Sequence, residues 1–257
     1  MTGLKERQGE GPGALLTPRL KAWSVHLFTA SGVVAGVIAL DRVQAHEMRA
    51  AFLWMMVAVF IDSVDGTLAR RWQVQRYAPE IDGRRLDDMV DYFTWVLLPV
   101  VAMAWWGWLP PVVWAAPLLC SALGMANAQA KTDDDYFLGF PSLWNIVALY
   151  LWHWQLPVAL NGAMVVTLSL CVLLPIRFIY PSKTRHFRRL SMALMTIWGF
   201  LVLFSLTGTG PLHELCFRWS NLFPLYYLGL SFWLHCQDKP VAARSGTESG
   251  EERVDER

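Results

Sequence analysis

Four aspartates and several small residues between positions 62 and 91 are the part of this sequence best suited to chemistry. They follow the pattern Asp62-x-x-Asp65-Gly66-x-x-Ala69-Arg70, twelve residues, then Gly83-x-x-x-Asp87-x-x-x-Asp91. The carboxylates lie at the ends of long apolar stretches, where ionised groups are costly and therefore indicate function. The small residues among them leave room for a bulky ligand against the backbone. The pattern therefore predicts an active site.

Helical geometry would gather these residues on two facing surfaces. At about 100° per residue, the four residues Asp62, Asp65, Gly66 and Ala69 share one face of a helix. Gly83, Asp87 and Asp91 are spaced by four and share one face of the next helix. Two such helices side by side would present two carboxylates each to a common centre. Oxygen ligands suit Mg²⁺ or Mn²⁺, and the absence of His and Cys from the pattern argues against zinc.

An alternative interpretation treats the acidic residues as a solvated helix end beside arginines. Arg70, Arg71, Arg84 and Arg85 lie close to them in the sequence. A solvated helix end, however, would not need glycine and alanine on the same face as the carboxylates. The small residues therefore favour an active site.

The composition is that of a membrane protein. The 257 residues are 54% hydrophobic, include 14 Trp and are only 17% charged. We expect an all-α integral membrane protein, a bundle of about eight transmembrane helices in a domain covering residues 14–236. The polar segments 1–13 and 237–257 are expected to be disordered tails. The predicted spans are residues 23–40, 48–68, 87–106, 111–130, 140–156, 160–179, 191–208 and 218–236.

The basic residues predict the orientation of this bundle. With eight spans and a cytoplasmic N terminus, all of the 22 Lys and Arg residues except Arg42, Arg49 and Arg218 lie on the cytoplasmic side, as the positive-inside rule requires. Both termini and all four motif aspartates would then be cytoplasmic. Ser24 and His26 make the first apolar stretch a poor signal peptide, so we expect a retained helix.

The segment before the first span, residues 15–23, predicts a short interfacial helix. Thr17 suits its N-cap and Pro18 its first helical position. Leu20 and Trp23 would face lipid while the basic residues between them meet anionic headgroups. A plain basic flank of the first span fits the same residues equally well.

The aspartate pattern resembles the signature of the CDP-alcohol phosphotransferase family. Its members are integral membrane enzymes that move a substituted phosphate from a CDP-linked donor to an alcohol and release CMP. The twelve-residue gap before Gly83 is longer than in many members and is similar to that of a bacterial branch that uses choline. Residues 22–32 and 131–141 also resemble that branch, as do eight spans instead of the usual six. The resemblance covers nearly the whole chain except the tails.

The resemblance implies a role for each motif residue. A pair of Mn²⁺ or Mg²⁺ ions would be held by Asp62, Asp65, Asp87 and Asp91. Asp91 would also act as the general base. The CDP pocket would be lined by Asp65, Gly66, Ala69, Arg70 and Gly83.

The resemblance also implies substrates and surroundings. CDP-diacylglycerol and choline would react to give phosphatidylcholine and CMP, among membrane lipids of a bacterial cytoplasmic (inner) membrane. We expect a homodimer and no nucleic-acid partner.

Recognition of choline calls for aromatic faces, because a quaternary ammonium has no N–H donors. The candidates share the predicted cytoplasmic side and combine acidic and aromatic side chains. They are Tyr92, Asp133, Asp134, Asp135 and Tyr136, with Phe137 beside them and Trp23 and Trp144 as weaker candidates. The alternative is that these aromatic residues face lipid or form an interfacial belt, as most aromatic residues of membrane proteins do.

Two other functions remain compatible with the sequence. An enzyme of the same class could use glycerol phosphate, serine or inositol phosphate, although a phosphorylated acceptor should need additional basic residues near the motif. A divalent-cation transporter would instead need a carboxylate path through the membrane. The aspartates gather at one face of the predicted bundle, which disfavours transport.

Overall fold

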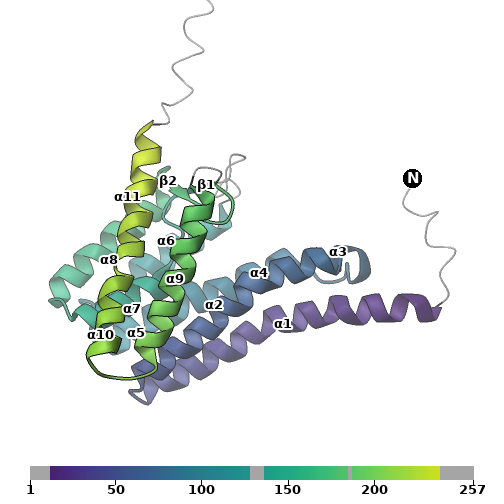
Figure 1. The fold of residues 1–257 in the computed structure, drawn as a ribbon, viewed down its shortest axis with the longest axis horizontal. Coiled ribbons are helices and arrows are strands. Elements are labelled where there is room, and N and C mark those ends of the chain that lie inside the picture. The colour runs from purple at the N-terminus through teal and green to yellow at the C-terminus, as the bar shows by residue number, and fades with distance from the viewer. Residues whose placement is uncertain (1–11, 128–135, 185–186, 238–257) are drawn as a thin grey trace, which may run out of the picture.

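The chain is mostly helical (Figure 1) in a computed structural model that describes residues 12–127, 136–184 and 187–237. Most of both predicted tails, residues 1–11 and 238–257, lies outside the described residues. In chain order the elements are α1 (Pro12–Gln44), α2 (Met48–Arg71), α3 (Val74–Tyr77), α4 (Gly83–Asp91), the π-helix η2 (Tyr92–Leu97), α5 (Leu98–Trp105), α6 (Ala115–Ala126), β1 (Tyr136–Leu138), α7 (Trp144–Trp154), α8 (Val158–Leu173), β2 (Arg177–Ile179), α9 (Arg188–Leu206), α10 (Pro211–Ser220) and α11 (Leu222–Gln237).

Four helices of the described residues are long and apolar enough to cross a membrane. They cover Leu16–Gln44, Met48–Arg71, Gly83–Trp105 and Arg188–Leu206. This confirms the predicted helical membrane protein. The other predicted spans coincide with shorter helices, of which α7 has 11 residues, α6 has 12, and α8 and α11 have 16 each.

The predicted span 160–179 is too long at its end. Helix α8 stops at Leu173, and residues 177–179 form strand β2. Pro175 follows the helix and cannot continue it, because its ring clashes with the preceding turn and it has no backbone N–H to donate. The all-α prediction therefore misses one short strand pair.

The predicted separate helix at residues 15–23 is wrong. Helix α1 runs unbroken over 33 residues, about 50 Å, and Pro18 lies inside it. This length exceeds the hydrocarbon core of a bilayer, which is about 30 Å thick. The N-terminal part of α1 packs against α3 through a small apolar cluster that includes Ala22 and Val74, and Arg19 pairs with Glu80. These contacts explain why the basic flank continues the helix.

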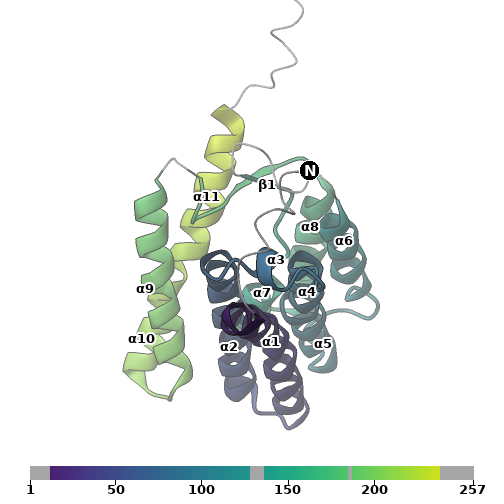
Figure 2. The same ribbon diagram turned by 90° about the vertical axis from the view of Figure 1, so that its right-hand side faces the viewer.

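Helices α2 and α4 both pack against α1, and α1 lies alongside α2 in both views (Figures 1 and 2). Two glycines one turn apart on α1 make the approach to α4 and η2 possible. A Cβ at Gly32 would lie 2.8 Å from Val90, and one at Gly36 would overlap the ring of Phe93. Small residues spaced by four allow such close contact between membrane helices. The contact fixes α4 against α1.

The π-helical turn η2 directly follows Asp91. Leu98 donates its backbone N–H to the carbonyl of Phe93, five residues earlier. Pro99 has no backbone N–H, so the α-helical hydrogen-bond pattern is interrupted just there. The π turn lets one helix continue from Gly83 to Trp105 through the interruption.

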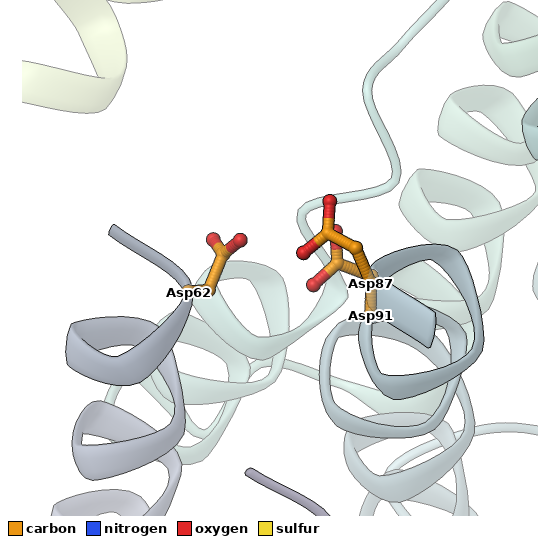
Figure 3. Close-up of side chains that lie close together, drawn as sticks. All are labelled: Asp62, Asp87 and Asp91. Carbon is orange, nitrogen blue, oxygen red and sulfur yellow. The ribbon is translucent and has the colours of Figure 1, made fainter. Parts of the chain in front are cut away.

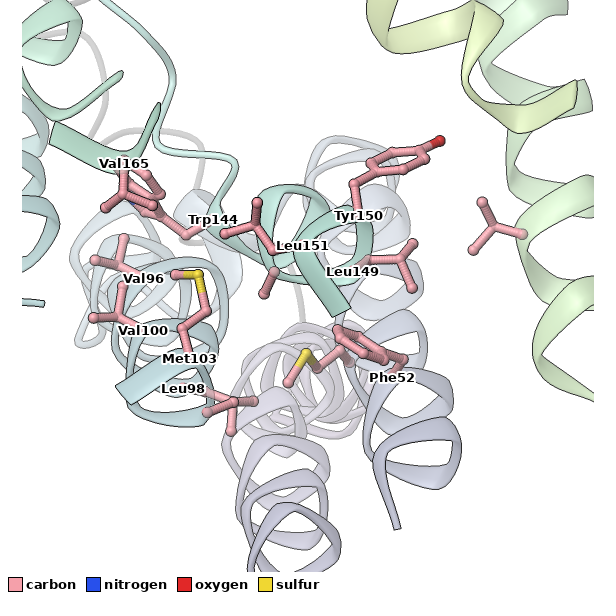
Figure 4. Packing of buried hydrophobic residues seen from close by; sticks show 14 of the residues in the cluster. Phe52, Val96, Leu98, Val100, Met103, Trp144, Leu149, Tyr150, Leu151 and Val165 are labelled. Carbon is pink, nitrogen blue, oxygen red and sulfur yellow. The ribbon is translucent and has the colours of Figure 1, made fainter. Parts of the chain in front are cut away.

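The main hydrophobic core lies between α2, α5 and α7 (Figure 4). Trp144, Leu98 and Met103 are completely buried in it. The indole N–H of Trp144 donates to Ser121 Oγ at 2.8 Å, so its polar atom is satisfied inside the core. Trp144 is therefore a packing residue, and its prediction as a choline contact is not supported.

Strands β1 and β2 form an antiparallel pair that joins distant parts of the chain. Tyr136 lies opposite Ile179, and Phe137 lies opposite Phe178. Ile179 donates its backbone N–H to Ser231 Oγ at 3.1 Å, which ties β2 to α11. In Figure 2 the pair runs between α11 and the side of the bundle formed by α6 and α8.

Candidate active site

Three of the four motif aspartates form one cluster. Asp62 extends from α2, and Asp87 and Asp91 extend from α4 toward it (Figure 3). One oxygen of each carboxylate lies within 4.8 Å of the others. Opposite oxygens around a Mg²⁺ ion are about 4.2 Å apart, twice its bond length of ~2.1 Å. Small side-chain rotations would therefore bring the three oxygens to the spacing of ligands around one ion.

The start of α4 places two of these carboxylates. Asp82 is the N-cap, and its Oδ1 accepts hydrogen bonds from the backbone N–H groups of Arg84 at 3.1 Å and Arg85 at 3.3 Å. The helix that begins at Gly83 then carries Asp87 and Asp91 one turn apart on the same face, as the spacing predicts. Asp88 is exposed and stands outside the cluster.

One oxygen of Asp91 supports the assignment of a cation to this cluster. Its Oδ1 is buried and has no hydrogen-bond partner among the described residues. A buried carboxylate oxygen without a donor is costly. A cation between the three carboxylates would supply the missing partner. The donor set contains only carboxylate oxygens, which suits Mg²⁺ or Mn²⁺.

Asp65 lies outside the three-carboxylate cluster. It is 6% exposed, and its Oδ2 accepts a hydrogen bond of 2.8 Å from the Thr29 hydroxyl of α1. Three residues turn a helix by about 300°, so Asp65 is rotated from Asp62 toward α1. The structure therefore holds the four aspartates as a group of three and a neighbour bound to α1.

The small residues of the motif have different surroundings. A Cβ at Gly66 would meet only the far end of the Arg70 side chain, at 3.4 Å, so the surface of α2 is open there. At Gly83 a Cβ would lie 3.4 Å from the His26 ring, so this glycine makes room for a neighbouring side chain. Ala69 packs against the apolar cluster between α1 and α3. Arg70 is exposed beside the aspartates.

Sequence motifs alone assign no defined role to two polar residues of α1. Thr29 binds Asp65, and His26 lies 6% exposed beside Gly83 with its Nε2 3.5 Å from the carbonyl of Ala78. The signal that could have found them is their spacing. Polar residues three apart within an apolar helix share one face, and here that face meets the motif helices.

The predicted choline residues divide between described and undescribed parts of the chain. The Tyr92 hydroxyl donates to the carbonyl of Leu118 at 3.1 Å and so joins η2 to α6. Tyr136 is 7% exposed, and the guanidinium of Arg177 lies 5.7 Å from the centroid of its ring. Asp133, Asp134 and Asp135 lie outside the described residues.

The fold and the cluster define a helical membrane protein with a carboxylate centre suited to a divalent cation. A sequence profile of the CDP-alcohol phosphatidyltransferase family matches residues 24–176, which include the whole aspartate pattern. The chain belongs to this family.

Similar proteins support the assignment of the chain to this family. A phosphatidylcholine synthase of Pseudomonas aeruginosa is 33% identical over 232 residues, which cover 85% of this chain and 94% of the relative. A phosphatidylcholine synthase of Bradyrhizobium diazoefficiens is 37% identical over 211 residues, 77% of this chain and 78% of the relative. One of Legionella bozemanae is 34% identical over 212 residues, 77% of this chain and 96% of the relative.

Proposed function

We propose that the protein transfers the phosphatidyl group of CDP-diacylglycerol to choline and releases CMP, in a reaction that depends on a divalent metal. The observation that carries this proposal is the cluster of Asp62, Asp87 and Asp91 in a chain of this family. Choline as the acceptor is supported by the relatives, which are phosphatidylcholine synthases matched over most of their length.

The carboxylates would hold the metal, Mn²⁺ or Mg²⁺, as one ion or a pair. Asp62, Asp87 and Asp91 would be ligands, and Asp65 would join them from its position next to Thr29. When bound, the metal neutralises pyrophosphate charge and stabilises the departing CMP. The unpartnered Oδ1 of Asp91 supports this assignment.

Asp91 would act as the general base. Its carboxylate accepts the proton of the choline hydroxyl as that oxygen attacks the phosphorus bearing diacylglycerol. The new P–O bond joins phosphate to choline, and the bond to the second phosphate breaks. CMP leaves with the electron pair of that bond. The acceptor must therefore place its hydroxyl beside α4.

The CDP moiety would lie along α2. The open surface at Gly66 admits the nucleotide close to the helix, and the exposed guanidinium of Arg70 can pair with its phosphates. Asp65, Ala69 and Gly83 complete the proposed pocket. The acyl chains of the donor would remain in the surrounding lipid.

The proposed topology has eight spans in a bacterial inner membrane, with both termini and the active site cytoplasmic. The α2 end that carries the aspartates also carries Arg70 and Arg71, and α4 begins with Arg84 and Arg85. This concentration of positive charge supports a cytoplasmic location. The helices of 11–16 residues are shorter than a full span and would require a locally thinner bilayer. A homodimer is part of the same proposal.

CMP release tests the proposal directly. The purified protein in lipid is given CDP-diacylglycerol, Mn²⁺ and a panel of acceptors that includes choline, serine, glycerol phosphate and inositol phosphate. We expect release that depends on choline, at least a hundredfold lower in Asp91→Asn. Asp88→Asn is the matched control, because it makes the same change at the exposed neighbour and should keep wild-type activity.

The other outcomes identify the alternatives. Release with another acceptor would keep the family chemistry and overturn choline as the substrate. Metal flux across vesicles without CMP release would favour a transporter. Equal activity of Asp91→Asn and Asp88→Asn would remove Asp91 as the base.

A further inference from the structure

The strand pair forms an aromatic platform from two distant segments. The rings of Phe137 and Tyr180 are stacked, with centroids 4.5 Å apart and planes at 25°. Phe137 lies opposite Phe178 in the ladder, so Tyr180 is its diagonal neighbour on the partner segment. The pair exists only because β1 and β2 meet.

A tight turn holds Tyr180 in place. Its backbone N–H donates to Thr184 Oγ1 at 2.8 Å, and its carbonyl accepts from the N–H groups of Lys183 and Thr184, both at 2.9 Å. Thr184 is 2% exposed, so the turn is anchored in the protein. The ring therefore has a fixed position.

Tyr180 lies within electrostatic reach of the carboxylate cluster. Burial raises the pKa of its phenol, and the negative charges of Asp62 and Asp87 raise it further, whereas Arg70 lowers it. Those are motif residues of α2 and α4. Tyr180 is therefore close enough to these motif residues for their charges to act on its phenol.

The Tyr180 ring already binds an ammonium group. The Nζ of Lys183 lies 4.7 Å from its centroid, within the range of a cation–π contact. Lys183 is exposed, so its side chain can move away into solvent. Tyr136 also has a cation over its ring, Arg177, but the tyrosine is buried. Of these two rings, Tyr180 is the one from which the cation can be displaced.

We propose that the platform of Tyr180 and Phe137 binds the trimethylammonium group of choline, which takes the place of the Lys183 ammonium over the Tyr180 ring. This inference rests on the proposed function and names the residues that select the acceptor. A quaternary ammonium cannot donate hydrogen bonds, so the face of an aromatic ring suits it. The hydroxyl, two carbons away, would extend toward Asp91.

Substrate kinetics of Tyr180 variants test the platform. In Tyr180→Leu we expect the KM for choline to rise about fivefold to thirtyfold, as the loss of a cation–π contact implies. The KM for CDP-diacylglycerol should stay within twofold. Tyr180→Phe keeps the ring and should keep the choline KM within threefold. The matched control is Tyr77→Leu, which removes a ring under the Arg76 guanidinium on α3 and should leave both KM values unchanged.

A neutral acceptor isolates the role of charge. The alcohol 3,3-dimethylbutan-1-ol has the shape of choline without its positive charge. Wild type should prefer choline by kcat/KM, and Tyr180→Leu should lose most of that preference. The platform would be overturned if the KM for choline and the KM for the neutral alcohol rose equally in Tyr180→Leu. It would also be overturned if Tyr180→Phe were as impaired as Tyr180→Leu.

Equilibrium binding of choline separates this inference from the proposed function. Choline binding by wild type that weakens in Tyr180→Leu, without any CMP release, would support the platform and refute the activity. Choline-dependent CMP release that is unchanged in Tyr180→Leu would support the activity and refute the platform. Lys183→Gln should bind choline about threefold more tightly, and an unchanged or weaker affinity would overturn the displacement of Lys183.

Discussion

The hydroxyl of Thr29 donates a hydrogen bond of 2.8 Å to Oδ2 of Asp65, and this bond connects the first membrane helix to the aspartate motif. Both residues are 6% exposed, so water does not readily replace either partner. Asp65 has a neutral donor on α1, while the other three motif aspartates face one another between α2 and α4. The bond thus fixes Asp65 beside the cluster.

We expect Thr29→Val to lower kcat/KM for CMP release about tenfold or more, because a buried carboxylate would lose its donor while the side-chain volume is kept. Thr29→Ser keeps the hydroxyl and should retain at least half of the activity. Steady-state CMP release by equal amounts of inserted protein measures the effect. A fully active Thr29→Val would show that the bond does not position Asp65 for the reaction.

The cluster predicts a specific pattern of metal affinity. Replacing Asp87 by Asn removes a charged ligand, so we expect Mn²⁺ to bind at least tenfold more weakly. Electron paramagnetic resonance of free Mn²⁺ measures this without turnover. Asp88→Asn should bind as wild type does. Equal affinities in the two variants would place the metal elsewhere.

The sequence predicted those parts of the site that depend on local geometry. Asp87 and Asp91 share a face because they are four apart on one helix. Asp62 meets them because α2 and α4 both pack against α1. The hydrogen bond that holds Asp65 beside the cluster comes from Thr29, a residue 36 positions away. Helical periodicity contains no information about that contact.

Two other missed features depend on distant contacts, whereas a third had a local signal. The stacking of Phe137 on Tyr180 requires a strand pair between two loops, and neither strand has more than three residues. The N-cap expected at Thr17 is absent because α1 begins at Pro12, and contacts with α3 hold the continuous helix. The π turn after Asp91 had a local signal in Pro99, whose missing N–H interrupts the helix.

Close packing of α1 predicts a difference between two glycines. A Cβ at Gly36 would overlap the Phe93 ring, whereas a Cβ at Gly199 in α9 would have no atom of the described residues within 4 Å outside its own helical turn. We expect Gly36→Ala to lower the thermal unfolding midpoint by several degrees. Gly199→Ala should leave it unchanged or raise it, since alanine favours helix. Equal unfolding midpoints of the two variants would mean that α1 and η2 are packed less tightly than the structure indicates.

Gly66 allows the nucleotide pocket to be tested without disturbing the fold. An added Cβ would meet only the mobile end of Arg70, at 3.4 Å, so Gly66→Ala should fold and insert normally. The methyl group would stand on the surface of α2 where CDP is proposed to lie. We therefore expect the KM for CDP-diacylglycerol to rise about tenfold while the choline KM changes less than twofold. Unchanged donor kinetics in the well-folded variant would place the nucleotide away from this face, because a ligand in contact with the glycine backbone could not tolerate the added carbon.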